Sequence, residues 1–301
     1  MVLLDYLLKY PTIISYPSID PVMSSSILRR VLALNGVYTY VLIPHEHVVR
    51  GMCIGRATVV GVPLEAGYEV VDDMVLISVG GGYRGAYLVG RDLSRKPIEE
   101  VEPVPKSLTR FVVNVVRRYI GGAFDSLAEL ADERVGGELL RKASAYVTYR
   151  PSALHRISDA VYEGRVDEVF DSLESLARRY DERRSAVIAD IVGRAIRIGD
   201  FVVTFYGVLT DEEVYVREVS RELLSRYGAV AVVGVRDLNA LTLSVTCRPG
   251  HPALSKIPKV LEGLNYEEAS ASSTSRYIVF KHPRPRVTEV IRLFKERLFN
   301  T

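Results

Sequence analysis

The hydrophobic pattern of this chain changes its period twice, and that change limits the folds that it can adopt. Apolar and β-branched runs of strand length dominate the first part, for example 37–43 and 74–79. From 108 to 198 the apolar residues recur at helical spacing, and strand-like runs return from 201 onward. A two-residue period indicates strands, whereas a period of about 3.6 indicates amphipathic helices. The sequence therefore predicts an α/β segment, a helical block and a second α/β segment.

Length and composition favour two domains. The chain has 301 residues, which is too long for a single hydrophobic core. Of these residues, 48% are hydrophobic and 25% are charged. It lacks an uncharged apolar run of about 18 residues and a basic leader with a cleavage site, so we expect a cytoplasmic protein without a membrane span. Cys53 and Cys247 lie too far apart to suggest a disulfide framework. The absence of Gln and the five Asn favour a thermophilic source.

The N-terminal segment reads as a strand–helix–strand unit. Residues 12–15 form a short β-branched run, and Ser24, Ser25 and Ser26 are candidate N-caps for a helix over 27–34. Asn35-Gly36 is typical of a left-handed helix end, and a strand over 37–43 follows. Short links between these elements predict a parallel sheet.

Further strands are expected over 52–62, 74–79 and 86–89. The cluster Gly80-Gly81-Gly82 joins two strands rather than a strand and a helix, so it predicts a turn and not a phosphate loop. Pro97, Pro103 and Pro105 indicate a linker. The helical block then predicts helices over 108–120, 124–131, 137–149, 153–162 and 166–198, the last with a break near Tyr180-Asp181.

The C-terminal segment reads as a second α/β domain. Its expected elements are a strand over 201–206, a helix over 212–227 capped by Asp211, strands over 229–235 and 241–247, a helix over 252–261, a turn over 263–271, a strand over 276–281 and a helix over 287–299. A boundary near Ile198 follows. We therefore expect domains over 1–120 and 199–301, with a helical linker region over 121–198.

Charge is uneven along the chain although the net charge is only +2. Residues 240–301 contain ten basic and five acidic side chains, hence +5, which leaves −3 for residues 1–239. This excess could meet phosphate groups, and a solvated basic helix face is the alternative.

Few residue patterns point to catalysis. His45-Glu46-His47 lacks further ligands at suitable spacing and is read as surface histidines, and Asp72-Asp73 is read as a turn before a strand. A Gly-x-Ser-x-Gly elbow and a Cys–His pair are both missing, which argues against nucleophilic hydrolysis.

The order of these elements resembles the DHH phosphoesterases, the superfamily of the RecJ single-strand exonucleases, over nearly the whole chain. The resemblance implies an α/β fold with a parallel-sheet DHH-type N-terminal domain, a helical linker and a smaller DHHA1-type α/β domain. It also implies two metal ions held by aspartates and histidines. The first motif corresponds to residues 14–24, where Asp20 stands at the last aspartate position.

Other residues occupy most of the ligand positions that the resemblance implies. Gly80 stands where the second motif has an aspartate, and Gly90, Arg91 and Asp92 stand in for the Asp-His-His triplet. Asp132 corresponds to a fourth aspartate. A two-ion centre needs a dense set of carboxylate and imidazole ligands, and an arginine there repels cations. We therefore expect no catalytic residue, no metal and no cofactor, as in a pseudo-enzyme.

The C-terminal motifs of the family, an arginine after a strand and a glycine-rich turn with a histidine, are altered as well. Arg248 matches the arginine, whereas Tyr266 and two glutamates replace the histidine and its neighbours. Candidates for nucleic-acid contact are Arg248, Lys256, Lys259, Tyr266, Arg276 and Lys281. An ion pair with an acidic neighbour is the alternative for Arg248. The strand over 276–281 is a candidate edge for a partner strand.

A RecJ-like scaffold without its metal ligands resembles the archaeal and eukaryotic Cdc45-type replication factors. That likeness implies a non-catalytic replisome subunit that binds the GINS complex and the MCM helicase, with single-stranded DNA as a further expected ligand. Two other classes stay open. One is an active or residual phosphoesterase on short oligonucleotides or cyclic dinucleotides, and the other is a nucleic-acid-binding module without replisome partners.

Overall fold

The computed structural model describes residues 2–49, 51–62, 64–132, 136–148, 150–207, 212–228, 230–236, 241–249, 251–282 and 285–299. The chain divides into two compact units, Met1–Asp181 and Glu182–Thr301. The division falls inside one long helix, α8, earlier than the boundary expected near Ile198. None of the described helices is both long and apolar enough to cross a membrane.

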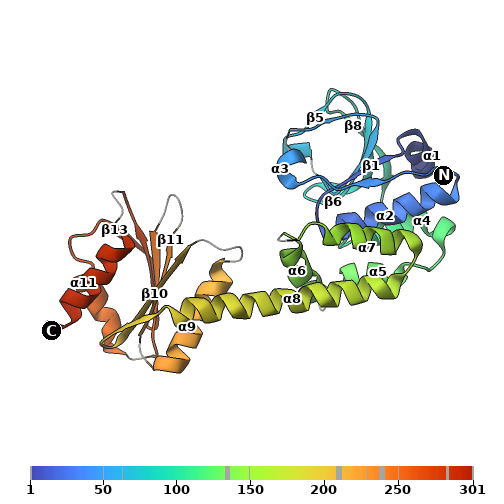
Figure 1. Ribbon diagram of the computed structural model, residues 1–301. Coiled ribbons are helices and arrows are strands. Elements are labelled where there is room, and N and C mark those ends of the chain that lie inside the picture. The colour runs from blue at the N-terminus through green and yellow to red at the C-terminus, as the bar shows by residue number, and fades with distance from the viewer. Residues whose placement is uncertain are drawn as a thin grey trace. The chain divides into compact units, whose positions relative to one another are not determined.

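The first unit combines a six-stranded sheet, a small two-stranded sheet and a layer of helices (Figure 1). Its strands are β1 Thr12–Ser15, β2 Val41–Leu42, β3 Cys53–Ile54, β4 Ala57–Val60, β5 Glu69–Val70, β6 Met74–Gly80, β7 Tyr83–Val89 and β8 Arg95–Glu100. Its helices are α1 Val2–Lys9, α2 Ile19–Leu34, α3 Glu46–Val49, the 3₁₀ turn η1 Leu64–Ala66, α4 Leu108–Ile120, α5 Asp125–Asp132, α6 Gly136–Val147, α7 Ala153–Glu163 and the first part of α8 Val166–Gly193.

The large sheet has the strand order β2-β1-β4-β6-β7-β8. The first four strands are parallel, which confirms the parallel sheet expected here, and β7 and β8 add antiparallel to its end. Neighbouring residues of one strand enter opposite cores, as Ile13 and Ile14 of β1 do. Parallel strands are buried on both faces in this way because layers cover both sides of the sheet.

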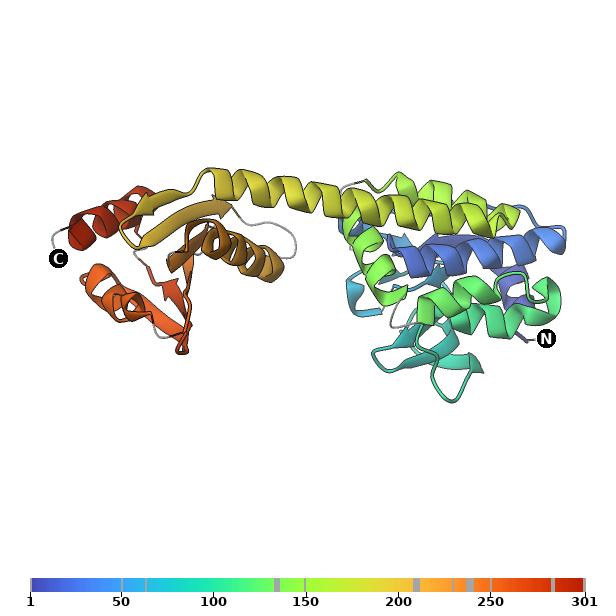
Figure 2. The same cartoon turned by 90° about the horizontal axis from the view of Figure 1, so that it is seen from below.

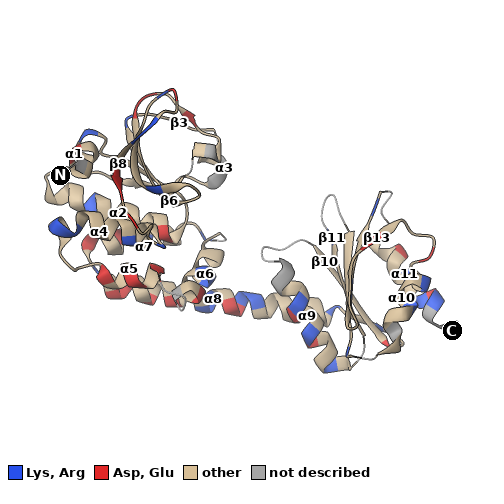
Figure 3. Ribbon diagram, turned by 180° about the vertical axis from the view of Figure 1, so that it is seen from behind, with Lys and Arg blue, Asp and Glu red and all other residues tan. Residues whose placement is uncertain are grey.

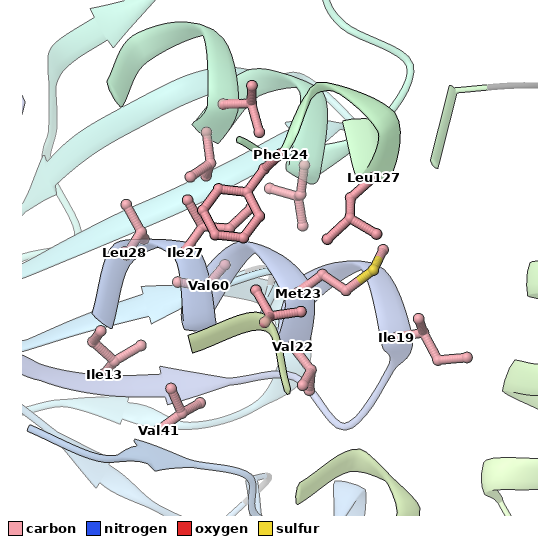
Figure 4. Packing of buried hydrophobic residues seen from close by; sticks show 14 of the residues in the cluster. Ile13, Ile19, Val22, Met23, Ile27, Leu28, Val41, Val60, Phe124 and Leu127 are labelled. Atoms are coloured by element: carbon pink, nitrogen blue, oxygen red, sulfur yellow. The ribbon is translucent and has the colours of Figure 1, made fainter. Parts of the chain in front are cut away.

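One face of the sheet is covered by α2, α4, α5, α6 and α7, which lie together in Figures 1 and 2. Met23, Phe124 and Leu127 meet between α2 and the start of α5, and Ile13 and Val60 close the core from the sheet (Figure 4). All five side chains are fully buried. These helices of the helical block therefore belong to the core of the first unit.

Helix α2 begins earlier than expected, at Ile19, with Ser18 as its N-cap residue. Ser24, Ser25 and Ser26 are therefore buried inside the helix rather than at its start, and the N-cap expectation is wrong. The hydroxyls of Ser24 and Ser26 donate to carbonyl groups four residues earlier, which lets serine enter a helix interior. The left-handed end is confirmed, because Gly36 has a φ of 81°.

The second unit contains one mixed sheet with helices on both faces (Figure 1). Its strands are β9 Ile196–Ile198, β10 Phe201–Gly207, β11 Val230–Arg236, β12 Leu241–Thr246, β13 Tyr266–Ala271 and β14 Ser275–Phe280. Its helices are the end of α8, α9 Glu212–Tyr227, the 3₁₀ turn η2 Pro252–Lys256, α10 Ile257–Val260 and α11 Val287–Phe299. Asp211 and Ala229, which the sequence placed in this unit as a cap and a strand residue, lie outside the described residues.

The strand order of this sheet is β13-β14-β12-β11-β10-β9, with β10 and β11 parallel. The helices α10 and α11 cover one face, where Phe201 packs edge-on against Phe294 with ring centroids 5.6 Å apart. The end of α8 and α9 cover the β10 and β11 part of the other face, through residues such as Val219 and Leu223. The α/β fold class with a smaller second α/β unit is confirmed.

Several expected features differ from the structure. Residues 266–271 form strand β13 rather than a turn, and β14 is an internal strand, so 276–281 cannot be an open edge. Pro97 lies in β8 instead of a linker, because β8 is an edge strand and tolerates a residue without an N–H donor. Helix α8 is unbroken at Tyr180-Asp181 and ends at Gly193, before β9.

Candidate functional site

The carboxyl ends of β1 and β4 lie next to the start of α2, which is where parallel sheets commonly place a binding site. The Tyr16 N–H donates to the Val60 carbonyl over 2.9 Å, and the Gly61 N–H donates to the Ile77 carbonyl over the same distance. Gly61 has a φ of 75°, and a Cβ atom there would lie 2.6 Å from the Pro21 ring. Glycine is therefore required for the close approach of β4 to α2.

Asp20, which the sequence resemblance placed at the last aspartate of the first motif, holds the start of α4. Its Oδ2 accepts from the Leu108 N–H at 2.9 Å, and its Oδ1 accepts from the Thr109 N–H at 2.9 Å and the Thr109 hydroxyl at 2.6 Å. The first N–H groups of a helix have no partner within the helix, and the dipole there favours negative charge. Asp20 thus caps α4 from a different helix.

Asp132 lies at the same helix start, on α5. Its Oδ1 accepts from the Ser107 hydroxyl at 2.7 Å, and its Oδ2 pairs with Arg110 Nε at 2.6 Å. Both side chains of this ion pair are about one-fifth exposed. Ser107 in turn caps α4 by accepting from the Arg110 N–H at 3.1 Å. Asp20 and Asp132 therefore flank one helix start, and protein donors occupy their carboxylates.

The other degenerate motif positions lie elsewhere. Gly80 ends β6 in a tight hairpin, where it pairs with Tyr83, which confirms that the glycine cluster is a turn. Val89 pairs with Met74 at the opposite end of the same hairpin, so Gly90, Arg91 and Asp92 follow β7 at that far end. Because β6 and β7 are antiparallel, the structure does not bring these three positions together with Gly80 and Asp20.

Asp92 is an exposed turn residue. Its Oδ1 accepts from the Ser94 hydroxyl at 2.6 Å and from the Ser94 N–H at 3.1 Å. Both donors hold the pKa of the Asp92 carboxyl below its ordinary value, and the Ser94 hydroxyl has the larger effect. Asp72, in the turn before β6, is bound in the same way by the Asp73 N–H and by Arg56 Nε at 2.7 Å, and its pKa is lowered too. Both carboxylates therefore stabilise the turns in which they lie.

The described residues do not fit a two-ion metal centre. Among them, no group of three or more His, Cys, Asp or Glu side chains is placed where it could hold a metal ion. His45 is exposed before α3, whereas the side chains of Glu46 and His47 lie outside the described residues. A pair of divalent ions needs several free carboxylate or imidazole ligands, and the donors around Asp20 and Asp132 are already protein groups.

The basic candidates of the second unit do not converge on one place. Arg248 follows β12 beyond Thr246, which pairs with Ser275, whereas Tyr266 pairs with Phe280 at the other end of β14. Tyr266 is half-buried and packs edge-on against Phe280. Arg248 is exposed, and within the described part of the chain its side chain has neither a hydrogen bond nor an ion pair. Lys256 and Lys259 are exposed on η2 and α10.

The two glutamates of β13 neutralise two of the candidates. Glu268 pairs with Arg276, and Glu267 pairs with Lys281 at 2.8 Å. The Lys281 ammonium donates to Glu267 and attracts its charge, which lowers the pKa of that carboxyl. These pairs join the edge strand β13 to β14. Two of the ten basic side chains after residue 240 are therefore paired with glutamates of the same sheet.

A groove that was not predicted lies between α9 and the uncovered strands of the same sheet. It has a volume of about 740 Å³ and is lined from α9 by Arg217, Ser220 and Arg221. Strand β12 supplies hydroxyls from every second residue, Thr242, Ser244 and Thr246. This alternation of Leu or Val with Ser or Thr is visible in the sequence and could have indicated a strand with one polar face.

A second feature that was not predicted is an exposed apolar segment at the edge of the first sheet. Among the described strands, β2 is the last one there and pairs with β1 alone. In the segment that runs from the end of α2 to β2, Leu34 is 60% exposed, Tyr38 82%, Tyr40 76% and Leu42 50%. We call residues 34–42 the β2-edge segment. Exposed apolar side chains next to a free strand edge are typical of a protein interface.

The sequence matches no protein-family model and no curated protein. Among solved structures, it is similar to the pGpG-specific phosphodiesterase PggH from Vibrio cholerae, with 9% identity over 96% of this chain and 98% of that chain and a TM-score of 0.41. It is also similar to RecJ with Mn²⁺ from Thermus thermophilus, with 12% identity over 95% of this chain and 51% of that chain and a TM-score of 0.30.

A third similar structure is Cdc45 from Entamoeba histolytica, with 6% identity over 96% of this chain and 95% of that chain and a TM-score of 0.30. The chain thus spans about half of the Thermus RecJ and nearly all of the other two. RecJ and Cdc45 are the types of protein that the sequence resemblance named. Likeness of this size assigns neither a family nor an activity.

Proposed function

We propose that this chain is a non-catalytic member of the RecJ-like group, a replisome subunit that binds the GINS complex and the MCM helicase and contacts single-stranded DNA. The observation that carries the non-catalytic part is the use of Asp20 and Asp132 at the start of α4. A carboxylate that accepts two backbone N–H groups and a hydroxyl has little capacity left for a metal ion. The partners follow from the sequence resemblance.

The β2-edge segment supports a binding role. A free strand edge can accept a strand from a partner through main-chain hydrogen bonds, and neighbouring side chains then supply specificity. Tyr38 and Tyr40 are the kind of large, amphipathic side chains that are enriched in protein interfaces. This segment is therefore the surface that we assign to the protein partner.

A nuclease assay with Mn²⁺ on the purified chain tests the non-catalytic part. The expected result is no turnover of short oligonucleotides or cyclic dinucleotides, together with no stoichiometric Mn²⁺ binding to the wild-type chain in calorimetry. Robust turnover that Asp20→Asn abolishes, while Asp92→Ala retains it, would establish the phosphoesterase alternative. Calorimetry measures Mn²⁺ binding to the wild-type chain, so it remains informative even if changes at Asp20 disturb folding.

Recovery of partners from a native extract tests the replisome part. The wild-type chain is expected to recover GINS and helicase subunits, and Tyr38→Ser with Tyr40→Ser is expected to lose them. Tyr227→Ser is the matched control, since Tyr227 is 37% exposed in the second unit, far along the sequence from β2. Recovery of neither GINS nor MCM subunits by the wild-type chain would refute this role.

A further inference from the structure

The groove beside α9 exists because α9 and the end of α8 cover only part of a sheet face. Val219 and Leu223 of α9 pack with β10 and β11, whereas β12 and β14 continue the same face without a described helix above them. The floor of the groove comes from Thr242, Ser244 and Thr246 of β12 and from Ser275 and Tyr277 of β14. Ser244 pairs with Tyr277 and Thr246 with Ser275, so these side chains share one face.

The wall of the groove is positively charged. Arg217 and Arg221 lie one turn apart on the exposed side of α9, where Figure 3 shows several basic residues. Neither arginine has a hydrogen bond or an ion pair to another described residue. The glutamates next to them are already engaged, because Glu218 accepts from Arg184 Nε at 2.8 Å and Glu222 accepts from Arg226 Nε at 2.7 Å.

The described lining residues include no Asp or Glu. Arg276 also lines the groove, but Glu268 already pairs with it. Among the described lining residues, Arg217 and Arg221 are therefore the two cations without an ion pair, and the Nε of Arg276 is buried without a hydrogen-bond partner. Guanidinium groups on neighbouring turns suit adjacent phosphates, since each can donate two parallel hydrogen bonds.

A buried hydroxyl adds an independent sign of a ligand. Ser220 lies between the two arginines on α9, is 3% exposed, and its Oγ has no hydrogen-bond partner among the described groups. It lines the groove. A buried polar atom without a partner costs free energy that a bound group can recover by hydrogen bonding to it.

We propose that this groove binds single-stranded DNA, with Arg217 and Arg221 on successive phosphates and the Ser and Thr hydroxyls on sugar and base atoms. Tyr277 is 40% exposed and offers a ring on which a base stacks. Val233 and Val235 give the floor an apolar part. The volume of about 740 Å³ lies within the range of small-ligand sites, enough for a nucleotide-sized part of the strand. Cations, hydroxyls and an exposed aromatic side chain together favour a nucleic-acid strand over a peptide.

This inference rests on the proposed function only for the choice of DNA as the ligand. The test is binding of a fluorescently labelled oligothymidylate to the full chain across a salt series, followed by anisotropy. Arg217→Ala with Arg221→Ala is expected to weaken binding and to reduce the slope of log K against log salt by about 1.4, as for two lost phosphate contacts on a single strand. This assay contains neither GINS nor helicase, so a failure of DNA binding does not decide the replisome role, which the extract experiment tests separately.

The matched control is Arg292→Ala with Lys295→Ala, two exposed cations on α11 of the same unit that do not line the groove. It is expected to keep the wild-type slope. Equal slopes for the α9 double variant and the wild type would overturn the proposal. So would a slope change that appears only in the control variant, or an absence of oligothymidylate binding by the wild-type chain.

Two single variants separate a DNA site from a plain anion site. Tyr277→Ala is expected to weaken oligothymidylate binding about fivefold or more, because base stacking is lost. Ser220→Ala is expected to weaken binding without lowering Tm, since the hydroxyl has no described protein partner to lose. If inorganic phosphate displaces the oligothymidylate in the millimolar range and Tyr277→Ala has no effect, the groove is a phosphate site and the DNA assignment is wrong.

Discussion

The start of α4 and the groove beside α9 use charged residues in opposite ways. At α4, Asp20 and Asp132 have protein donors on both carboxylate oxygens, and Arg110 is paired. At α9, Arg217 and Arg221 have no partner in the described part of the chain, while Glu218 and Glu222 are bound by other arginines. One region uses its charge for folding, and the other leaves its charge for solvent or a ligand.

This contrast shows why residue type alone is a poor guide to function. The two aspartates match positions that bind metal in the family which the sequence resembles, yet the fold directs them to a helix start. The arginines of α9 match no motif, yet the fold places them beside a groove without a partner among the described residues. Variants that change stability in one region and binding in the other test the contrast directly.

The largest expected loss of stability follows Asp20→Ala. The change removes the acceptor of two backbone N–H groups and of the Thr109 hydroxyl, so we expect a loss of roughly 2–3 kcal/mol in the free energy of unfolding. Urea denaturation of the wild type and the variant measures it. A catalytic carboxylate would behave in the opposite way, because removing it usually leaves stability unchanged or raises it. An unchanged unfolding midpoint would thus break the comparison.

Asp132→Ala is expected to cost less, about 1–2 kcal/mol, because it removes one ion pair and one hydroxyl contact. Asp132→Asn is the matched control, since its amide oxygen can still accept from Ser107 while the charge is lost. We expect it to fall between the alanine variant and the wild type in urea denaturation. If both variants unfold like the wild type, Asp132 has no structural role at α4.

Glu267→Gln should have a smaller, pH-dependent effect. Lys281 lowers the pKa of Glu267, so this pair stabilises the folded state above the unfolded pKa, near 4.5, and the contribution is lost as the pH falls through the lower folded pKa. The urea midpoints of wild type and variant should differ slightly at about pH 7 and converge towards about pH 3. A difference that stays constant across this range would exclude the ion pair as its cause.

The smallest expected effect on stability belongs to Arg217→Ala with Arg221→Ala. Neither arginine has a described protein partner, and alanine is at least as good a helix former, so the unfolding midpoint should not fall. Arg110→Ala provides the contrast, because it breaks the pair with Asp132 and should destabilise the chain. A clear loss of stability in the α9 variant would show that these arginines have a structural role and would weaken the groove proposal.

Local pattern was sufficient for much of the fold. The helix expected over 108–120 is α4, and the one over 287–299 is α11, because both have apolar residues at helical spacing. The parallel sheet followed from short links between strand and helix signals. The errors lie where the local signal was ambiguous, as with Ser24–Ser26 inside α2 and with the glutamate-bearing strand β13, which pairs antiparallel with β14.

The candidate site was less accessible from sequence than the fold. Ser107 directly before the helical pattern was a readable N-cap signal, and the hydroxyl alternation in β12 was a readable strand face. Nothing in the sequence, however, indicates that Asp20 would reach Leu108 and Thr109, because that contact joins segments 88 and 89 residues apart. The position of Gly90–Asp92 at the far end of the hairpin likewise depends on the direction of β7.

The sequence by itself determined which segments become helices and strands, the α/β class, and the composition of each polar face, because these depend on residue period and on neighbours within a few positions. Tertiary structure decided the charge contacts that join distant segments. The donors to Asp20 come from α4, 88 and 89 residues along the chain, and those to Asp132 lie 22 and 25 residues away. That is why Asp20 became a helix cap, and why Arg217 and Arg221 were left facing a groove.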